Sequence, residues 1–199
     1  MAEIPAISDV PFGSPDIIRE LKLAVDTLAG RIGGNVDYGT IDGVRTKVLD
    51  IVHLCNMGRI KARAYRDAAQ NIDAYGHTKV AIDTISFDTE GVVDIANSRI
   101  IPNLAGYYQV SGNARLGSIP DGEHFFCSIF KNGERVSAGA YFRSGSSIGG
   151  QGISTVSDLV YMNGTTDYLE LYIWNSYSSA LPLVVGQSFQ NYISVVGPF

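Results

Sequence analysis

The clearest pattern of hydrophobic and polar positions in the sequence lies at residues 107–116. From Tyr108 to Leu116 every second residue is apolar or small, and the residues between them are polar. A period of two is what a β-strand with one buried face requires. Pro102 and Gly106 interrupt the chain just before this stretch. We therefore expect one strand to end at residues 100–101 and the next to begin at Tyr107.

Further short strands separated by turns are predicted from residue 62 to the C-terminus. We expect them at residues 62–65, 78–87, 92–101, 123–131, 134–142, 155–162, 168–174 and 188–196. Loops are expected at 68–76 and 144–152. Asn132-Gly133 and Asn163-Gly164 each predict a tight hairpin, because both central positions of such a turn must accept positive φ. The pattern is typical of an antiparallel β-sandwich of the jelly-roll type.

The N-terminal part shows a helical period instead. Ser14 is a good N-cap and Pro15 suits the first helical position. Apolar residues then recur at spacings of three and four, at Ile18, Leu21, Val25, Leu28 and Ile32. This spacing predicts an amphipathic helix, which either packs on its own domain or forms a short parallel coiled coil. Residues 44–57 suit a second helix.

The composition changes near residue 60, after which aromatic side chains become frequent. We therefore divide the chain into a helical N-terminal module, residues 1–60, and a β-domain, residues 61–199. The chain is 45% hydrophobic and 18% charged, which is typical of a globular protein. Its net charge is -5 and it has no basic cluster, so we expect no nucleic-acid partner.

Cys55 and Cys127 fall in different predicted domains, so we expect two reduced, buried thiols and no disulfide. The first residues lack the basic segment and the unbroken apolar core of a signal peptide. No run approaches the roughly 20 apolar residues of a membrane helix. We expect a protein that is made in the cytosol and is not inserted into a membrane.

Several segments resemble a known family in the right order along the β-domain. They include Leu104-Ala105-Gly106-Tyr107-Tyr108, Ile129-Phe130-Lys131-Asn132-Gly133 and Asp167-Tyr168-Leu169-Glu170-Leu171. From about residue 62 onward the chain resembles the globular head of complement component one-q (C-one-q), which shares the tumour-necrosis-factor jelly roll. It looks like such a head in a virion fibre protein of a tailed bacteriophage. The resemblance implies a homotrimer. Apolar surface on the outside of the sheet predicts trimer contacts at Tyr168, Tyr172 and Trp174. A coiled coil would add contacts at Ile18, Leu21, Val25 and Leu28.

Motifs for catalysis and metal binding are weak in this sequence. Residues 145–149 match the hydrolase pattern Gly-x-Ser-x-Gly, but every histidine lies upstream of them, so we expect a flexible loop. Three carboxylates could meet across strands and hold calcium, but no calcium-loop motif is present, and we expect them to be solvated. These are Asp158, Asp167 and Glu170. The histidines, His53, His77 and His124, have unlike neighbours and are expected to be exposed or in the core. We therefore expect no enzyme, no cofactor and no metal site.

The leading functional hypothesis is a non-enzymatic structural protein of the virion surface. In it, a trimeric phage head or tail fibre docks on a capsid or tail protein through residues 1–60. The jelly-roll head binds a host-surface glycan or protein. The candidate contact residues are Arg143, Ser146, Gln151 and Tyr177. Two alternatives stay open: a capsid decoration or cement protein that stabilises the particle, and a bacterial ligand-binding module unrelated to phage.

Overall fold

The computed structural model of the chain describes residues 58–145 and 150–199, all within the unit Asn56–Phe199. The predicted N-terminal module therefore lies outside the described residues except for residues 58–60, and so do its expected trimer contacts, Ile18, Leu21, Val25 and Leu28. In the described ranges every regular element is a β-strand. Over the same ranges, no helix of the length and apolarity needed to cross a membrane occurs.

The first of two large sheets is built around the alternating stretch found in the sequence. It contains β1 (Ile60–Tyr65), β4 (Thr84–Asp88), β7 (Ala105–Ile119), β11 (Gly150–Asn163) and β14 (Tyr192–Gly197), in the order β11-β7-β14-β1-β4. All of its neighbouring strands are antiparallel. Tyr108, Val110, Ala114 and Leu116 of β7 are completely buried, as the period of two predicts.

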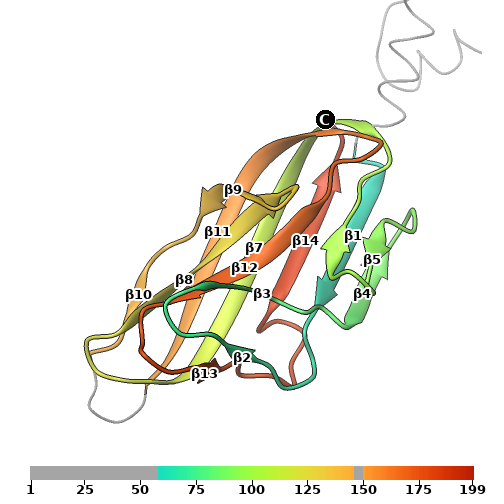
Figure 1. Cartoon of the computed structure of the whole chain (residues 1–199). Coiled ribbons are helices and arrows are strands. Elements are labelled where there is room, and N and C mark those ends of the chain that lie inside the picture. The colour runs from blue at the N-terminus through green and yellow to red at the C-terminus, as the bar shows by residue number, and fades with distance from the viewer. Residues whose placement is uncertain (1–57, 146–149) are drawn as a thin grey trace, which may run out of the picture. The chain divides into compact units, whose positions relative to one another are not determined.

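The second sheet is centred on the pair β8 (His124–Lys131) and β12 (Leu169–Asn175). Its strand order is β10-β8-β12-β6-β5, with β3 paired to β12 and β9 paired to β8. The remaining strands are β3 (His77–Lys79), β5 (Val93–Asp94), β6 (Arg99–Ile100), β9 (Glu134–Ala138) and β10 (Phe142–Arg143). A small pair, β2 (Asn71–Ile72) and β13 (Leu181–Pro182), lies at one end. Figure 1 shows the two large sheets facing each other, which is the antiparallel sandwich predicted from the sequence.

The core fills the space between the two sheets. The second sheet contributes alternate residues of its two central strands: Phe125, Cys127 and Ile129 from β8, and Leu169, Leu171 and Ile173 from β12. Cys127 is buried and unoxidised, as expected, whereas Cys55 lies outside the described residues. Gly112 lies at the centre of β7, where an added Cβ would come within 2.6 Å of Leu171 Cδ1. The absence of a side chain there lets the two sheets approach closely.

Three predicted strands are divided in the structure. Residues 78–87 contribute to both sheets, as β3 and β4, and residues 134–142 become β9 and the start of β10. Residues 92–101 form the hairpin β5–β6. Its turn is closed by the carboxylate of Asp94, which accepts hydrogen bonds from the Asn97 backbone N–H and from Arg99 Nε. A side-chain cap of this kind does not change the alternation of apolar and polar residues. The alternation therefore predicts one strand where the structure has a hairpin.

The two predicted hairpins have different outcomes. Asn132 and Gly133 have φ of 54° and 81° and join β8 to β9, which confirms the first. The second prediction is wrong, because β11 pairs with β7 and β12 pairs with β8. The segment after Asn163 therefore passes from one sheet to the other. Asn163 Oδ1 accepts hydrogen bonds from the backbone N–H groups of Thr165, Thr166 and Asp167. These bonds cap a loop that is longer than a tight turn.

The start of the described chain and the C-terminus lie at one end of the sandwich, and two loops lie at the other (Figure 1). Gly58 N donates to Pro198 O at 2.7 Å, and Phe199 N donates to Tyr107 O at 3.0 Å. The start of the described chain and the C-terminus therefore lie at the same end. The loops at residues 120–123 and 176–180 lie at the opposite end, close to β10 and the start of β11 (Figure 1). Any ligand held by these loops is therefore held far from the point where residues 1–57 join the domain.

Candidate functional site

The outer face of the five-stranded sheet carries a concentration of exposed apolar side chains. On β11 the inward residues are Val156, Val160 and Met162, so the residues between them point outward. Five large side chains on this face are about half exposed: Phe87 (48%), Tyr107 (51%), Ile153 (52%), Leu159 (53%) and Tyr161 (49%). The rings of Tyr107 and Tyr161 lie 5.4 Å apart, centre to centre. Together with Leu159 they form a ridge along the β11 edge of the face.

A groove of about 240 Å³ lies on the same face. It is lined by Lys61, Phe87, Gln109, Ser111, Ser194, Val195 and Val196. Ligand pockets for small molecules usually measure ~300–1,000 Å³. This groove is smaller than such pockets, and its exposed surface is mostly apolar. We call the outer face with its ridge and groove the five-stranded face.

The charged side chains of the five-stranded face are basic. Arg63 lies 4.1 Å from the centre of the Tyr192 ring, and its guanidinium donates to Ser188 O. Arg115 donates to Gln151 Oε1 at 2.6 Å. By strand alternation, no acidic residue of β1, β7, β11 or β14 points outward on this face. A surface that packs against it cannot add further positive charge without repulsion.

The candidate host-contact residues do not form one patch. Arg143 is exposed at the loop end, where its Nε donates to Gly122 O. Gln151 is exposed but is engaged by Arg115 of the five-stranded sheet. Tyr177 is half-buried and packs against the core, and its backbone N–H is capped by Asn175 Oδ1. Ser146 lies outside the described residues. Host contact by these residues stays a prediction.

The candidate trimer contacts on β12 and just before it are covered by their own chain. Tyr168 lies under the guanidinium of Arg99 at 4.9 Å, and Tyr172 lies 4.1 Å from the ring of Phe130. Trp174 lies against His124 and Phe126. All three are half-buried. Tyr107, Leu159 and Tyr161 of the opposite sheet are more exposed than these three, and sequence reasoning missed them. The available signal was a strand, β11, with apolar residues on both of its faces.

The carboxylates predicted to be solvated include two buried ones, so that prediction is wrong for Asp167 and Glu170. Asp167 is 7% exposed and Glu170 is 5% exposed, and each is paired with a lysine. Lys79 Nζ lies 2.9 Å from Glu170 Oε1. Asp158 instead accepts the backbone N–H of Leu159. Across the described part of the chain, no three His, Cys, Asp or Glu side chains gather as metal ligands.

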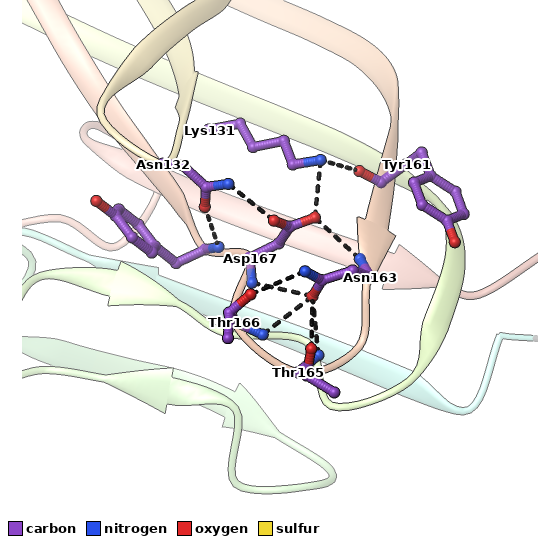
Figure 2. A network of polar contacts seen from close by, with 8 residues as sticks. Lys131, Asn132, Tyr161, Asn163, Thr165, Thr166 and Asp167 are labelled. Carbon is purple, nitrogen blue, oxygen red and sulfur yellow. Dashed lines mark hydrogen bonds and ion pairs between the residues drawn. The ribbon is translucent and has the colours of Figure 1, made fainter.

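Asp167 is the centre of a polar network that connects two loops (Figure 2). Its carboxylate accepts hydrogen bonds from Asn132 Nδ2 at 2.8 Å and from the Asn163 backbone N–H at 2.9 Å. Lys131 Nζ lies 2.8 Å from Asp167 Oδ2 and also donates to Tyr161 O. Together these bonds tie the β8–β9 turn to the loop between β11 and β12.

The remaining sequence candidates are placed as follows. His77 and His124 both lie in ring clusters on the outer face of the second sheet, and His53 lies outside the described residues. The hydrolase-like segment, residues 145–149, is described only at Gly145. The backbone N–H of His124 donates to Ser176 Oγ at 2.8 Å. Within residues 58–145 and 150–199, no histidine ring is hydrogen-bonded to a serine side chain.

Comparison with solved structures identifies the fold. The chain is similar to Eiger TNF from S. frugiperda, with a TM-score of 0.54 and 11% identity over 70% of this chain and 92% of that chain. Murine APRIL gives 0.52 and 9% over 69% and 97%. The globular domain of zebrafish complement 1qA protein gives 0.50 and 7% over 71% and 98%. The sequence matches no family model and no curated protein. At these low identities the likeness concerns the fold, and the described domain has the jelly-roll fold of tumour-necrosis-factor and C-one-q globular domains.

Proposed function

We propose that the chain is a non-enzymatic, homotrimeric binding protein of a tailed-phage particle. Its jelly-roll head contacts the host surface, and residues 1–60 attach it to a capsid or tail protein. The observation that carries the proposal is the five-stranded face, with its half-exposed apolar ridge and its groove. The fold supports a binding role over catalysis, although folds of this kind host many functions.

Association into a trimer would cover the five-stranded face. A single subunit leaves five large apolar side chains about half exposed on the five-stranded face, which marks an interaction surface. In a cyclic trimer each contact joins two different patches of neighbouring subunits. The ridge at Tyr107, Leu159 and Tyr161 and the groove beside Phe87 are two such patches on opposite sides of the same face. Inserting the ridge of one subunit into the groove of the next closes a ring without leaving either patch exposed.

The contact with a host is supported by the polarity of the domain. Gly58 and the C-terminus lie at one end, and the loops at residues 120–123 and 176–180 lie at the other (Figure 1). A head attached through the segment before Gly58 therefore presents its loops outward. Three copies around one axis multiply a weak contact into firm attachment, because the second and third contacts become intramolecular.

Sedimentation of the full chain tests the trimer and its interface. We expect the wild type to sediment as a trimer and Leu159→Glu to dissociate, because a carboxylate would be buried at the contact without a partner. Val136→Glu is the matched control, since Val136 is 44% exposed on β9 of the other sheet. A monomeric wild type contradicts the trimer. Equal behaviour of the two variants contradicts the interface.

Labelling and deletion test the role on the particle. Antibody against the protein should mark virions in electron microscopy, and virions that lack it should adsorb poorly to cells. Normal adsorption with lower particle stability would instead identify a decoration protein. Absence of the protein from virions contradicts the phage setting.

A further inference from the structure

The outer face of the second sheet carries a continuous group of rings. Phe126 lies at its centre, with the rings of Tyr141, Trp174 and His77 at 4.4, 5.5 and 5.9 Å from it, centre to centre. Four more ring contacts complete the group. His124 lies 5.2 Å from Trp174 and 5.7 Å from Tyr141. Phe130 lies 5.4 Å from His77 and 4.1 Å from Tyr172. We call this group the aromatic platform: His77, His124, Phe126, Phe130, Tyr141, Tyr172 and Trp174.

The platform is accessible at its rim. Tyr141 is 65% exposed and His77 is also exposed, whereas Trp174 and Tyr172 are half-buried. Phe126 and Phe130 form the buried floor at 3% and 9% exposure. The accessible rings are therefore those with polar atoms, namely a phenol, imidazoles and an indole. Such side chains combine an apolar face with a hydrogen-bonding edge, which suits a partly wet binding surface.

Two buried oxygens on this side of the sheet lack hydrogen-bond partners. They are Ser128 Oγ and Glu170 Oε2. Ser128 is fully buried and lies opposite Tyr172 in the strand pairing, and Glu170 lies opposite Phe130. A buried polar group without a partner costs roughly 1–3 kcal/mol. Buried oxygens without partners are uncommon in native proteins, and both of these lie on the side of the sheet that carries the aromatic platform.

The charge at the rim of the platform is positive and unmatched. Arg135 of β9 lies opposite Phe130 in the strand pairing and is exposed. No ion pair of Arg135 occurs among the described residues, whereas the acids Glu170 and Asp94 of the same sheet are paired with Lys79 and Arg99. Glu134 points to the other side of β9 by alternation. Burial and the nearby charge of Arg135 together lower the pKa of His77.

We propose that the aromatic platform binds an acidic carbohydrate of the bacterial cell surface, with its sugar ring on Tyr141 and Trp174 and its carboxylate or phosphate at Arg135 and His77. A pyranose has an apolar C–H face that stacks on an aromatic ring and a rim of hydroxyl groups for hydrogen bonds. An acidic substituent supplies the missing partner for Arg135. The inference rests on the proposed host-binding function and moves the contact from the loop end to the face of the sheet.

The chain contains one tryptophan, and it lies in the platform. Trp174 fluorescence of the full chain therefore reports an occupied platform directly. The probes are tri-galacturonic acid, its carboxyl-reduced form galactotriose, and an array of phosphate- and uronate-bearing bacterial oligosaccharides with their neutral counterparts. We expect a saturable fluorescence change with an acidic member of the set, and binding at least tenfold weaker for its neutral counterpart.

Amino-acid substitutions test which residues bind the sugar. Arg135→Gln and Tyr141→Ala replace exposed side chains and should each weaken binding at least tenfold without changing the melting temperature. Arg143→Gln at the loop end replaces another exposed arginine, so it is the matched control and should leave sugar binding unchanged. Equal binding of acidic and neutral sugars, no binding to any acidic sugar, or loss of binding only in Arg143→Gln would each overturn the proposal. Adsorption of virions is measured separately: adsorption that survives both platform variants leaves the proposed function standing and removes this inference alone.

Discussion

Lys131 Nζ lies 2.8 Å from Asp167 Oδ2, and this ion pair joins the β8–β9 hairpin to the loop between β11 and β12 (Figure 2). The Asp167 side chain is 9% exposed and that of Lys131 is 23% exposed. Burial by itself raises the pKa of Asp167. Hydrogen bonds from Lys131, Asn132 and the Asn163 backbone, with the charge of Lys131, outweigh that effect and bring its pKa below the ordinary 3.8.

The first prediction concerns the pH dependence of stability. A carboxylate whose pKa is lower in the folded state stabilises the fold above its unfolded pKa, and this contribution is lost as pH falls through the folded value. We expect Asp167→Asn to lower the free energy of unfolding by about 1–3 kcal/mol at pH 7. The difference from wild type should shrink below about pH 4. Urea unfolding at pH 7 and pH 3 measures this difference in the free energy of unfolding, and Asp121→Asn, at an exposed position, is the control. A difference that stays constant with pH contradicts the role of Asp167.

The second prediction concerns the exposed edge of β11. Three backbone groups along the free edge of this 14-residue strand already have hydrogen-bond partners. Tyr161 O accepts from Lys131 Nζ, Leu159 N–H donates to the Asp158 side chain, and Thr155 O accepts from Ala140 N–H. Edge strands protected in this way resist pairing with other chains. Lys131→Met should therefore aggregate faster than wild type when light scattering is followed at 37 °C. Asp167→Asn is the control, because it removes the ion pair and keeps the lysine over the edge. Equal aggregation of both variants would show that lost stability is the cause.

The third prediction concerns the close crossing of Gly139 over β11. A Cβ at this position would lie 2.3 Å from the carbonyl oxygen of Thr155. Because the obstacle is backbone, the strand must shift, and we expect Gly139→Ala to destabilise the fold by ~1–3 kcal/mol or more. Gly145→Ala meets nothing within 4 Å and should change stability little. Chemical denaturation of both variants gives the comparison, and similar midpoints would contradict it.

The fourth prediction concerns the buried thiol. Burial raises the pKa of Cys127 to about 11. At pH 8 roughly one molecule in a thousand then carries the reactive thiolate, and the sulfur is also inaccessible. In a Cys55→Ala background, iodoacetamide should label the protein only as fast as it unfolds, and sub-denaturing urea should accelerate the labelling. Rapid labelling without urea, followed by mass spectrometry, would contradict the burial.

The sequence by itself predicted the antiparallel sandwich, because strands and tight turns are indicated by residues that are close together in the chain. The alternation from Tyr108 to Leu116 and the Asn132-Gly133 turn each report the conformation of a few neighbouring residues. The same local character explains the errors. The Asp94 cap leaves no mark on the pattern of apolar positions, so that pattern predicts one strand where the structure has a hairpin. The dipeptide Asn163-Gly164 predicts a tight hairpin, but the Asn163 side chain caps a longer loop between the two sheets.

Only the tertiary structure decided which apolar side chains stay exposed and which polar groups are satisfied. Tyr172 and Trp174 are covered by Phe130 and Phe126, which are more than forty residues away in the sequence, whereas Leu159 and Tyr161 stay exposed on the opposite sheet. Likewise, Lys131 reaches Asp167 only because β8 and β12 are adjacent. Burial and pairing are properties of residues that are distant in the chain, and a period of two along a single strand carries no information about them.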